Sequence, residues 1–315
     1  MIMGIRIGTR SSQLALAQAF WVRNRISDRY PDMKVEIVKI KTRGDRIIDR
    51  PLSSIGGKGL FVKEIEEALQ RNDIDVAVHS LKDVPAEIPD NLHIGIIPER
   101  EDPHDVIISR NNIVLDHLPQ SSSIGTSSLR RTAQLLHYRP DLNVMPLRGN
   151  LDTRIRKLHT ENLQAIIIAA AGLRRVGLSE RITQSLPIEV MLPAIGQGAL
   201  GLELRRDDHN MKSFLAFLDH YPTRVAVEAE RSFLLELKGG CELPVGAHAI
   251  LDGTVVHLDA LVASPDGKRV FRNSMEGVAN EAELIGARLA RMLLDSGAQK
   301  ILDDIYGIDD RRFMR

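Results

Sequence analysis

The chain has 315 residues, of which 43% are hydrophobic and 27% charged, a composition typical of a soluble globular protein with two or three domains. Its 42 basic and 42 acidic residues cancel, which argues against whole-molecule attraction to nucleic acid or an anionic membrane. A single cysteine excludes an internal disulfide and a cysteine-rich zinc site, and only 4% of residues are aromatic, too few to favour a stacking platform for single strands.

Nothing near the N-terminus resembles the apolar core of a signal peptide, and the longest apolar run, at 165–171, is too short to span a bilayer. We therefore expect a cytoplasmic protein. The histidines are scattered and no two have the spacing of metal ligands, so no metal site is expected.

Short runs rich in valine and isoleucine alternate with amphipathic stretches over the first two thirds of the chain. Strands are expected at 4–8, 35–41, 75–79 and 92–97, with a helix after the N-cap residue Ser12 and another over 61–69. A charged segment at 99–103 is a candidate hinge. Strands at 122–125, 143–147 and 165–169 follow it, and a run at 199–204 could return the chain to the first sheet. The alternation predicts parallel or mixed α/β sheets covered by helices.

The pattern changes after about residue 220. A helix is expected over 223–237, followed by a tight loop at 238–244. Three runs at 245–251, 254–264 and 269–277 are separated by hairpin-like turns, and a helix over 280–295 ends the pattern. This order predicts a separate α+β domain.

Two glycine-rich segments invite a nucleotide-binding interpretation that their context does not support. GQGALG at 196–201 has the spacing of a dinucleotide fingerprint, but a strand-like run rather than a helix follows it. IGGKG at 55–59 lacks the first glycine and the final Ser/Thr of a P-loop. The second segment is either a plain surface loop or a mobile lid that carries Lys58, and we expect residues 46–58 to move slowly and to show fast amide hydrogen exchange.

Arginines recur where predicted strands end and helices begin. They are Arg10, Arg130, Arg131, Arg148, Arg154, Arg174 and Arg175. Ligands of open α/β sheets bind at the carboxyl ends of strands, and helix N-termini favour anions. Any one of these arginines is equally well explained as a solvated surface residue, but their recurrence points to a ligand with many carboxylates or phosphates. We expect Arg130, Arg131 and Arg148 to hold this ligand rather than the fold.

Two further side chains have both a structural and a chemical interpretation. Asp83 follows a predicted strand, where it is either a turn cap or a carboxylate that faces the cleft and stabilises a cation or moves protons. Cys241 is either a small buried apolar residue or, because glycines and Pro244 surround it, an exposed nucleophile or attachment point.

The chain resembles the hydroxymethylbilane synthase family, also called porphobilinogen deaminase, nearly from end to end. The matching segments are IGTRSS at 7–12, TRGD at 42–45, GGKGLFVKE at 56–64, AVHSLKDVP at 77–85, GTSSLRR at 125–131, LRGN at 147–150, AAGL at 170–173, PAIGQG at 193–198, ER at 230–231 and GGCELP at 239–244. Leu243 stands where the family more often has a β-branched residue, an apolar exchange.

The resemblance implies two type II periplasmic-binding-protein-like α/β domains with a cleft between them, and a C-terminal α+β domain with a small antiparallel sheet. The first would comprise 1–98 with 199–217 and carry the catalytic aspartate. The second would comprise 99–198 and carry the arginine cluster. The third, 218–315, would carry the cysteine that holds the cofactor.

The resemblance also implies a transferase of tetrapyrrole biosynthesis. Such an enzyme adds four porphobilinogen molecules in turn to a dipyrromethane cofactor, losing ammonia at each step, and water then releases hydroxymethylbilane. The cofactor would be bound by a thioether to Cys241. Porphobilinogen would be the only substrate, with neither nucleic acid nor membrane as a partner, and the protein would be a monomer.

The matching positions assign roles to residues of this chain. Asp83 would be the catalytic carboxylate, which stabilises the positively charged azafulvene left when ammonia departs. Lys58 would belong to a mobile loop over the cleft. The residues implied to bind the cofactor, the growing chain or the incoming substrate are Arg10, Ser12, Ser80, Lys82, Thr126, Ser127, Ser128, Arg130, Arg131, Arg148, Asn150, Arg154, Arg175 and Gln197.

Two rival functions come from other classes. A solute-binding or effector-sensing module would fit two α/β domains, but such proteins usually carry a signal peptide or a DNA-binding helix pair, and the sequence shows neither. A thiol-dependent acyltransferase needs a base near its cysteine, and no histidine is close to Cys241 in sequence.

Overall fold

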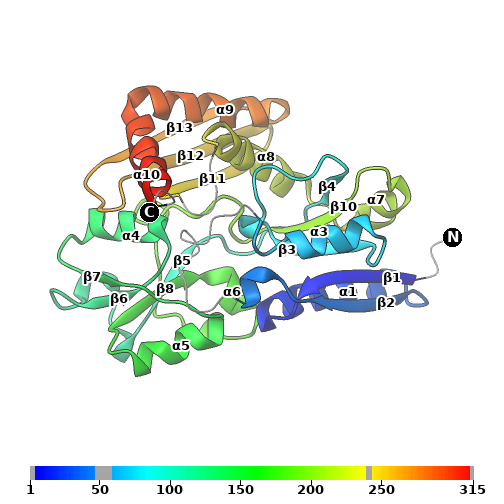
Figure 1. Ribbon diagram of the computed structural model, residues 1–315, viewed down its shortest axis with the longest axis horizontal. Helices are drawn as coiled ribbons and strands as arrows, with labels where there is room; N and C mark the ends of the chain where they lie inside the picture. The colour runs from blue at the N-terminus through cyan, green and yellow to red at the C-terminus, as the bar shows by residue number, and fades with distance from the viewer. Residues whose placement is uncertain (1–3, 47–58, 239–242, 313–315) are drawn as a thin grey trace.

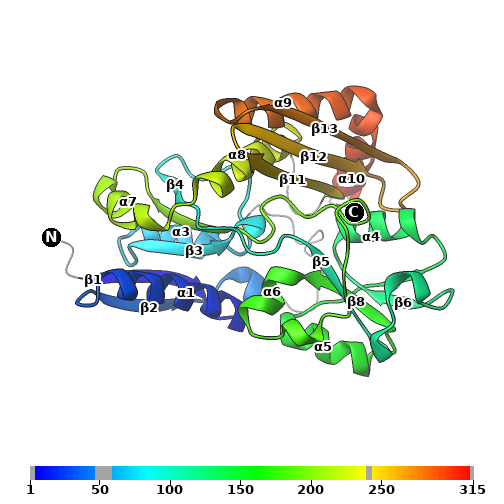
Figure 2. The same ribbon diagram turned by 180° about the vertical axis from the view of Figure 1, so that it is seen from behind.

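The computed structural model describes residues 4–46, 59–238 and 243–312 (Figure 1). Three sheets organise this part of the chain, and Figures 1 and 2 show the C-terminal sheet and its helix α9 (Ala282–Leu293) above the second sheet and to one side of the first. The fold class predicted from the sequence is confirmed: two α/β sheets are followed by an α+β part with a small antiparallel sheet.

The first sheet has five strands in the order β2-β1-β3-β10-β4. These strands are β1 (Gly4–Arg10), β2 (Lys34–Ile40), β3 (Val76–Ser80), β4 (Leu92–Ile96) and β10 (Leu200–Arg205). β1 is parallel to both β2 and β3, whereas β10 is antiparallel to β3 and β4. The predicted return of the chain to the first sheet is therefore confirmed, and the strand after the 196–201 glycines is β10, not a nucleotide-binding helix.

Helices cover both faces of this sheet because its strands are apolar on both sides. α1 (Gln13–Arg29) and α7 (His209–Leu215) pack on one face, where Val22 and Ile26 meet Ile5 and Ile7. α3 (Lys63–Gln70) packs on the other. α1 begins as expected at Ser12, whose Oγ accepts a hydrogen bond of 3.3 Å from the Ala15 amide.

The second sheet repeats this arrangement in the order β7-β6-β8-β5-β9. Its strands are β5 (Asp105–Ser109), β6 (Ser123–Gly125), β7 (Asn143–Met145), β8 (Ala165–Ala169) and β9 (Gln184–Ser185). In each sheet the edge strand β2 or β7 is parallel to its predecessor in the chain, β1 or β6, which is in turn parallel to the central strand β3 or β8. The strand in fourth place, β10 or β5, is antiparallel to the central strand. α4 (Leu129–Tyr138) covers one face, and α5 (Leu151–Thr160) and α6 (Ala170–Arg175) cover the other.

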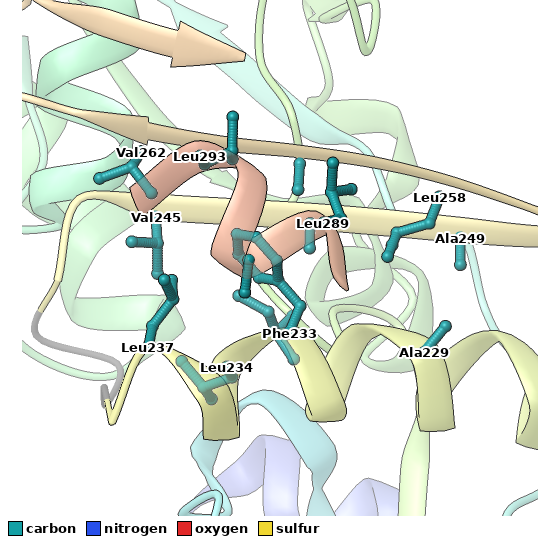
Figure 3. Packing of buried hydrophobic residues seen from close by; sticks show 14 of the residues in the cluster. Ala229, Phe233, Leu234, Leu237, Val245, Ala249, Leu258, Val262, Leu289 and Leu293 are labelled. Carbon is teal, nitrogen blue, oxygen red and sulfur yellow. The ribbon is translucent and has the colours of Figure 1, made fainter. Parts of the chain in front are cut away.

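The third sheet is an antiparallel meander of β11 (Val245–Asp252), β12 (Val255–Ala263) and β13 (Val270–Val278). α8 (Tyr221–Glu236) and α9 (Ala282–Leu293) pack on it, and α10 (Gln299–Arg312) follows. Figure 3 shows Phe233 of α8 pointing toward the sheet among Leu289, Val245 and Leu258, in the largest apolar cluster of the described residues.

Two chain segments join the first sheet to the second, and they touch each other. The Glu101 amide donates to the Gly198 carbonyl at 3.2 Å. Gly198 has φ +87°, and a Cβ there would lie 2.2 Å from the Glu101 carbonyl oxygen, so the close approach requires glycine. The division into 1–98 with 199–217, 99–198 and 218–315 remains a prediction, as does the hinge.

One buried carboxylate ties α8 to these connections. The Glu230 carboxylate accepts hydrogen bonds from Arg100 Nη1 at 2.6 Å, from the Gly196 amide at 2.7 Å and from the Ala249 amide at 2.8 Å. Arg100 Nε also donates to the Gln197 carbonyl at 2.7 Å. The third sheet, its helix and both connecting segments therefore share one polar junction.

Candidate active site

Asp83 lies at the end of β3, in the single 3₁₀ turn Leu81–Asp83. The connection 196–199 holds this turn in place, because the Leu81 amide donates to the Ala199 carbonyl at 3.0 Å and Gly196 lies directly against Leu81. Within the described residues no group donates a hydrogen bond to the Asp83 carboxylate, so the turn-cap interpretation is not supported by a contact.

A small cavity of about 50 Å³ lies against Asp83. Arg10, Ser12, Gln18 and Ser80 line it together with apolar side chains such as Phe61. These residues come from the end of β1, the start of α1 and the end of β3, which meet at one edge of the sheet. The carboxyl ends of parallel strands are where open α/β sheets bind ligands.

Neighbouring side chains hold several polar residues of this cavity in place. Arg10 Nη2 lies 2.6 Å from Asp45 Oδ1, and the Arg10 guanidinium lies over the Phe61 ring at 4.2 Å. Gln18 Nε2 donates to Ser80 Oγ at 2.7 Å.

Lys82 points away from this cavity toward the second sheet. Its Nζ donates to Gln197 Oε1 at 3.3 Å, and Gln197 Nε2 donates to the Pro103 carbonyl at 2.7 Å and to Asp105 Oδ1 at 3.1 Å. Burial, followed by the positive charge of Arg131, lowers the pKa of Lys82 to about 8. Gln197 therefore links the lysine beside Asp83 to the arginine cluster.

Asp105, the first residue of β5, holds two arginines of α4. Arg130 Nη1 lies 2.6 Å from Asp105 Oδ2, and Arg131 Nη2 lies 2.7 Å from Oδ1. All three side chains are buried. Burial alone raises the pKa of Asp105, but the charges and hydrogen bonds of the two arginines offset this and hold the pKa well below its usual range. The expectation that Arg130 and Arg131 are unnecessary to the folded core is therefore wrong.

Three other predicted arginines form no ion pair with a carboxylate among the described residues. Arg154 Nε donates to the Gly149 carbonyl at 2.8 Å, and Arg175 Nη2 donates to the Gly198 carbonyl at 2.6 Å. Burial lowers the pKa of each to about 10, so both remain charged at neutral pH. Arg148, which follows β7, forms no hydrogen bond or ion pair within the described residues. These three cations are available to an anion.

The remaining predicted residues lie around α4 and α5. Thr126 is buried and its Oγ1 accepts the Ser128 amide at 3.2 Å, while Ser128 is the N-cap residue of α4 without a capping side-chain bond. Ser127 Oγ bonds the Leu147 amide and carbonyl at 3.0 Å, which indicates a structural contribution. Asn150 caps α5, as expected, through the Thr153 amide at 3.0 Å.

Lys58 and Cys241 lie outside the described residues, as do residues 47–58 of the lid expected from 46 to 58. In the described parts of the chain, no three His, Asp or Glu side chains gather as a metal site would need. No helix among them has the length and apolarity that crossing a membrane requires.

Asp105 and Gln18 were missed in the sequence. The signal for Asp105 was an acidic residue directly before the apolar run at 106–108, where an unpaired charge would be costly. Gln18 gave a weaker signal, a polar residue between Ala15 and Val22 on the apolar side of α1.

Known proteins are similar to this chain over nearly its whole length. The family described as "Porphobilinogen deaminase, dipyromethane cofactor binding domain" matches residues 5–213, and "Porphobilinogen deaminase, C-terminal domain" matches residues 225–295. A porphobilinogen deaminase of Geobacter metallireducens is 54% identical over 302 residues, with 96% of this chain and 95% of the relative covered. One from Pelobacter propionicus is 51% identical, with 96% and 97% covered.

Solved structures of solute-binding proteins also align with the chain. The methionine-binding protein MetQ aligns with a TM-score of 0.44 and 16% identity over 69% of this chain and 90% of that one. The periplasmic aliphatic sulphonate binding protein SsuA from Escherichia coli aligns with a TM-score of 0.39 and 14% identity, over 75% and 71%. The matches to both family descriptions and to full-length relatives show that the chain belongs to the porphobilinogen deaminase family.

Proposed function

We propose that this enzyme joins four porphobilinogen molecules head to tail on a dipyrromethane primer, attached by a thioether to Cys241, and releases hydroxymethylbilane by hydrolysis. The observation that carries the proposal is the Asp83 carboxylate, which borders a cavity and has no hydrogen-bond donor among the described residues, at an edge of the sheet where cations gather.

Cations of the second sheet and its helices match the charge of the substrate. Each porphobilinogen ring carries an acetate and a propionate, so a growing chain gathers carboxylates. Arg148, Arg154 and Arg175 form no ion pair with a carboxylate among the described residues, and guanidinium groups bind carboxylates through two parallel hydrogen bonds. Some of the N–H donors of Arg130 and Arg131 already bind Asp105. Only their remaining donors can bind the substrate's carboxylates.

The same residues fit a dipyrromethane, whose two rings carry the same acidic groups. When bound, this group supplies the electron-rich pyrrole carbon to which the next unit is joined. We assign its binding and that of the chain to Ser80, Lys82, Thr126, Ser127, Ser128, Arg130, Arg131, Arg148, Asn150 and Arg154. Arg10, Ser12, Arg175 and Gln197 are assigned to the incoming substrate, and Lys58 to closure over the cleft.

Asp83 acts where charge develops. Departure of ammonia leaves a positive charge spread over the substrate's pyrrole ring. A fixed carboxylate beside the ring accepts hydrogen bonds from the pyrrole N–H and stabilises that cation, and such preorganised groups make the largest single contributions to many enzymatic rates. Arg10, which lines the same cavity, holds the substrate's carboxylates away from Asp83 and is itself oriented by Asp45 and Phe61.

Intact-protein mass spectrometry tests the attachment. The purified protein is expected to exceed its sequence mass by two pyrrole units, and Cys241→Ser should lose the addition. Since Cys241 is the only cysteine, the double variant Cys241→Ser, Ser274→Cys serves as a control that restores a thiol at an exposed position of β13. It should remain unmodified, because attachment requires the cavity and not a thiol alone.

The same measurement separates the rival functions. A solute-binding protein would carry no covalent addition, and an acyltransferase would carry an acyl group that hydroxylamine removes. An unmodified protein with full porphobilinogen-consuming activity would contradict the attachment to Cys241. We also propose that the enzyme acts in the cytoplasm as a monomer, which sedimentation of the purified protein and fractionation of cells would test.

A further inference from the structure

Arg231 of α8 binds the loop that follows the Asp83 turn. Its Nη2 donates to the Pro85 carbonyl at 2.7 Å and to the Ala86 carbonyl at 3.2 Å, and its Nη1 lies 3.4 Å from the Val84 carbonyl. One side chain thus contacts three successive carbonyl oxygens, beginning one residue after Asp83.

The face of α8 that carries Arg231 packs against the same turn. Val227, one helical turn earlier, lies in an apolar cluster with Leu81 and Val84, which flank Asp83 on either side. Ala229 and Phe233 project from the opposite side of α8 and belong to the core of the third sheet (Figure 3). α8 therefore holds the turn with one face while the third sheet holds its other face.

The negative charge of Glu203, on β10, stabilises the charged form of Arg231. Burial lowers the pKa of Arg231 to about 10, and the negative charge of Glu203 opposes that change. Glu203 is itself buried, and its Oε2 lies 3.0 Å from Nε2 of His79, the residue before Ser80 at the end of β3. Arg231 thus remains a cation at neutral pH and keeps its donors directed at the loop.

We propose that Arg231 is a positioning residue for the reaction at Asp83: its hydrogen bonds to Val84, Pro85 and Ala86 fix the turn, and thereby the place of the carboxylate relative to the cavity. The inference rests on the proposed role of Asp83. Arginine is required because its planar fork presents several donors at fixed angles, whereas a lysine ammonium is a single point that cannot reach three carbonyls spread along a loop.

The test compares Arg231→Lys with Arg110→Lys. Arg110 makes the same kind of contact far from Asp83: its Nη2 lies 2.9 Å from the Leu158 carbonyl and 3.3 Å from that of His159, and its Nε lies 3.2 Å from that of Leu158. Both substitutions keep the charge and remove carbonyl contacts, so their effects on thermal stability should be similar. Both proteins are examined with the cofactor attached.

Two readouts distinguish positioning from a general loss of stability. The kcat of Arg231→Lys, per folded and cofactor-loaded molecule, should fall about 10- to 100-fold with little change in KM, because a misplaced catalytic group slows the chemical step. Hydrogen exchange of the Val84 amide, which donates to the Leu81 carbonyl at 3.1 Å, should become faster. Arg110→Lys should change neither.

An Arg231→Lys enzyme with normal kcat and normal protection of Val84 would overturn the inference, as would equal losses of kcat in both variants. Asp83→Asn is measured beside them. If Asp83→Asn is also fully active, the proposed role of Asp83 fails; if it is inactive while Arg231→Lys is normal, only the positioning role fails.

Discussion

Arg131 and Asp105 form a buried pair in which Arg131 Nε and Nη2 both donate to Asp105 Oδ1, at 3.0 and 2.7 Å. The remaining nitrogen, Nη1, donates to the Ile167 carbonyl at 3.0 Å. Arg130 shares the same carboxylate through its other oxygen. The arginine cluster is therefore part of the core of the second sheet as well as of the candidate site.

The first prediction follows from this pair. Asp105→Ala leaves two guanidinium groups buried without their carboxylate, and removing one partner of a buried ion pair typically costs about 3–5 kcal/mol. Urea denaturation should show a loss of this size. Glu236→Ala, which breaks the exposed pair with Arg291, should cost much less. Equal losses in the two variants would contradict the structural role of Asp105.

Arg148 is predicted to behave differently from Arg131. Arg148→Ala removes no hydrogen bond or ion pair within the described residues, so the free energy of unfolding should change by no more than about 0.5 kcal/mol. Elongation should nevertheless stall, because a cation for the chain's carboxylates is lost. Mass spectrometry of the enzyme-bound intermediates locates the stalled stage. Arg131→Ala, in contrast, should lower stability and activity together, and a large drop in the melting temperature of Arg148→Ala would reverse this assignment.

Lys82 is predicted to give the enzyme a pH dependence near pH 8. Burial lowers the pKa of Lys82 to about 8, so the ammonium loses its proton, and with it its attraction for carboxylates, as the pH rises through that value. The kcat/KM for porphobilinogen should fall over this range. Lys82→Arg keeps the charge there and should remove this limb of the profile, even if its maximum is lower. If kcat/KM of Lys82→Arg still falls near pH 8, another group is responsible for this pH dependence.

Glu66 of α3 should make the fold less stable as the pH rises. Burial, and next the charge of Glu203, raises the pKa of Glu66 from 4.5 to about 7 in the folded chain. The folded state therefore holds a proton that the unfolded state releases between pH 4.5 and 7, so stability falls as pH rises through this window. Glu66→Gln should raise the melting temperature at pH 8 but not at pH 4.5.

The control for this prediction is Glu67→Gln, at the neighbouring, partly exposed position of α3. Calorimetry at the two pH values measures both variants. A gain in the melting temperature of Glu66→Gln that is the same at both pH values would show that packing, and not the buried charge, is responsible.

Much of the fold could be predicted because its strands are short apolar runs between turn residues. The strand at 165–169 and the three C-terminal strands lie within a residue or two of their expected places. β5 was missed because it begins with Asp105, directly after the charged segment assigned as a connection. α7 and α10 were also missed: α7 is only 7 residues long, and the sequence of α10 is weakly apolar with several charged residues.

Most residues of the candidate site could be proposed from the sequence, but Asp105, Gln18 and the contacts within the site could not. Asp105 meets Arg131 only because β5 lies beside β8 and α4 covers that sheet, an adjacency that depends on strand order. Arg231 lies 146 residues from Pro85 in sequence, and no local pattern connects them. Periodicity reports which face of an element is buried, whereas the pairing of charges depends on how the elements pack.

Single-turnover kinetics of cofactor-loaded Asp83→Asn tests the central claim most directly. Asparagine keeps the size and one acceptor oxygen but removes the negative charge, and loss of one preorganised group typically costs about 100- to 1000-fold in rate. We expect a loss of this order in a protein that still folds. If the negative charge matters more than its position, Asp83→Glu should retain more activity than Asp83→Asn. If the position of the carboxylate dominates, both variants should be nearly inactive. An Asp83→Asn enzyme that adds porphobilinogen at the wild-type rate would contradict the account and leave Asp83 as a turn residue without a chemical role.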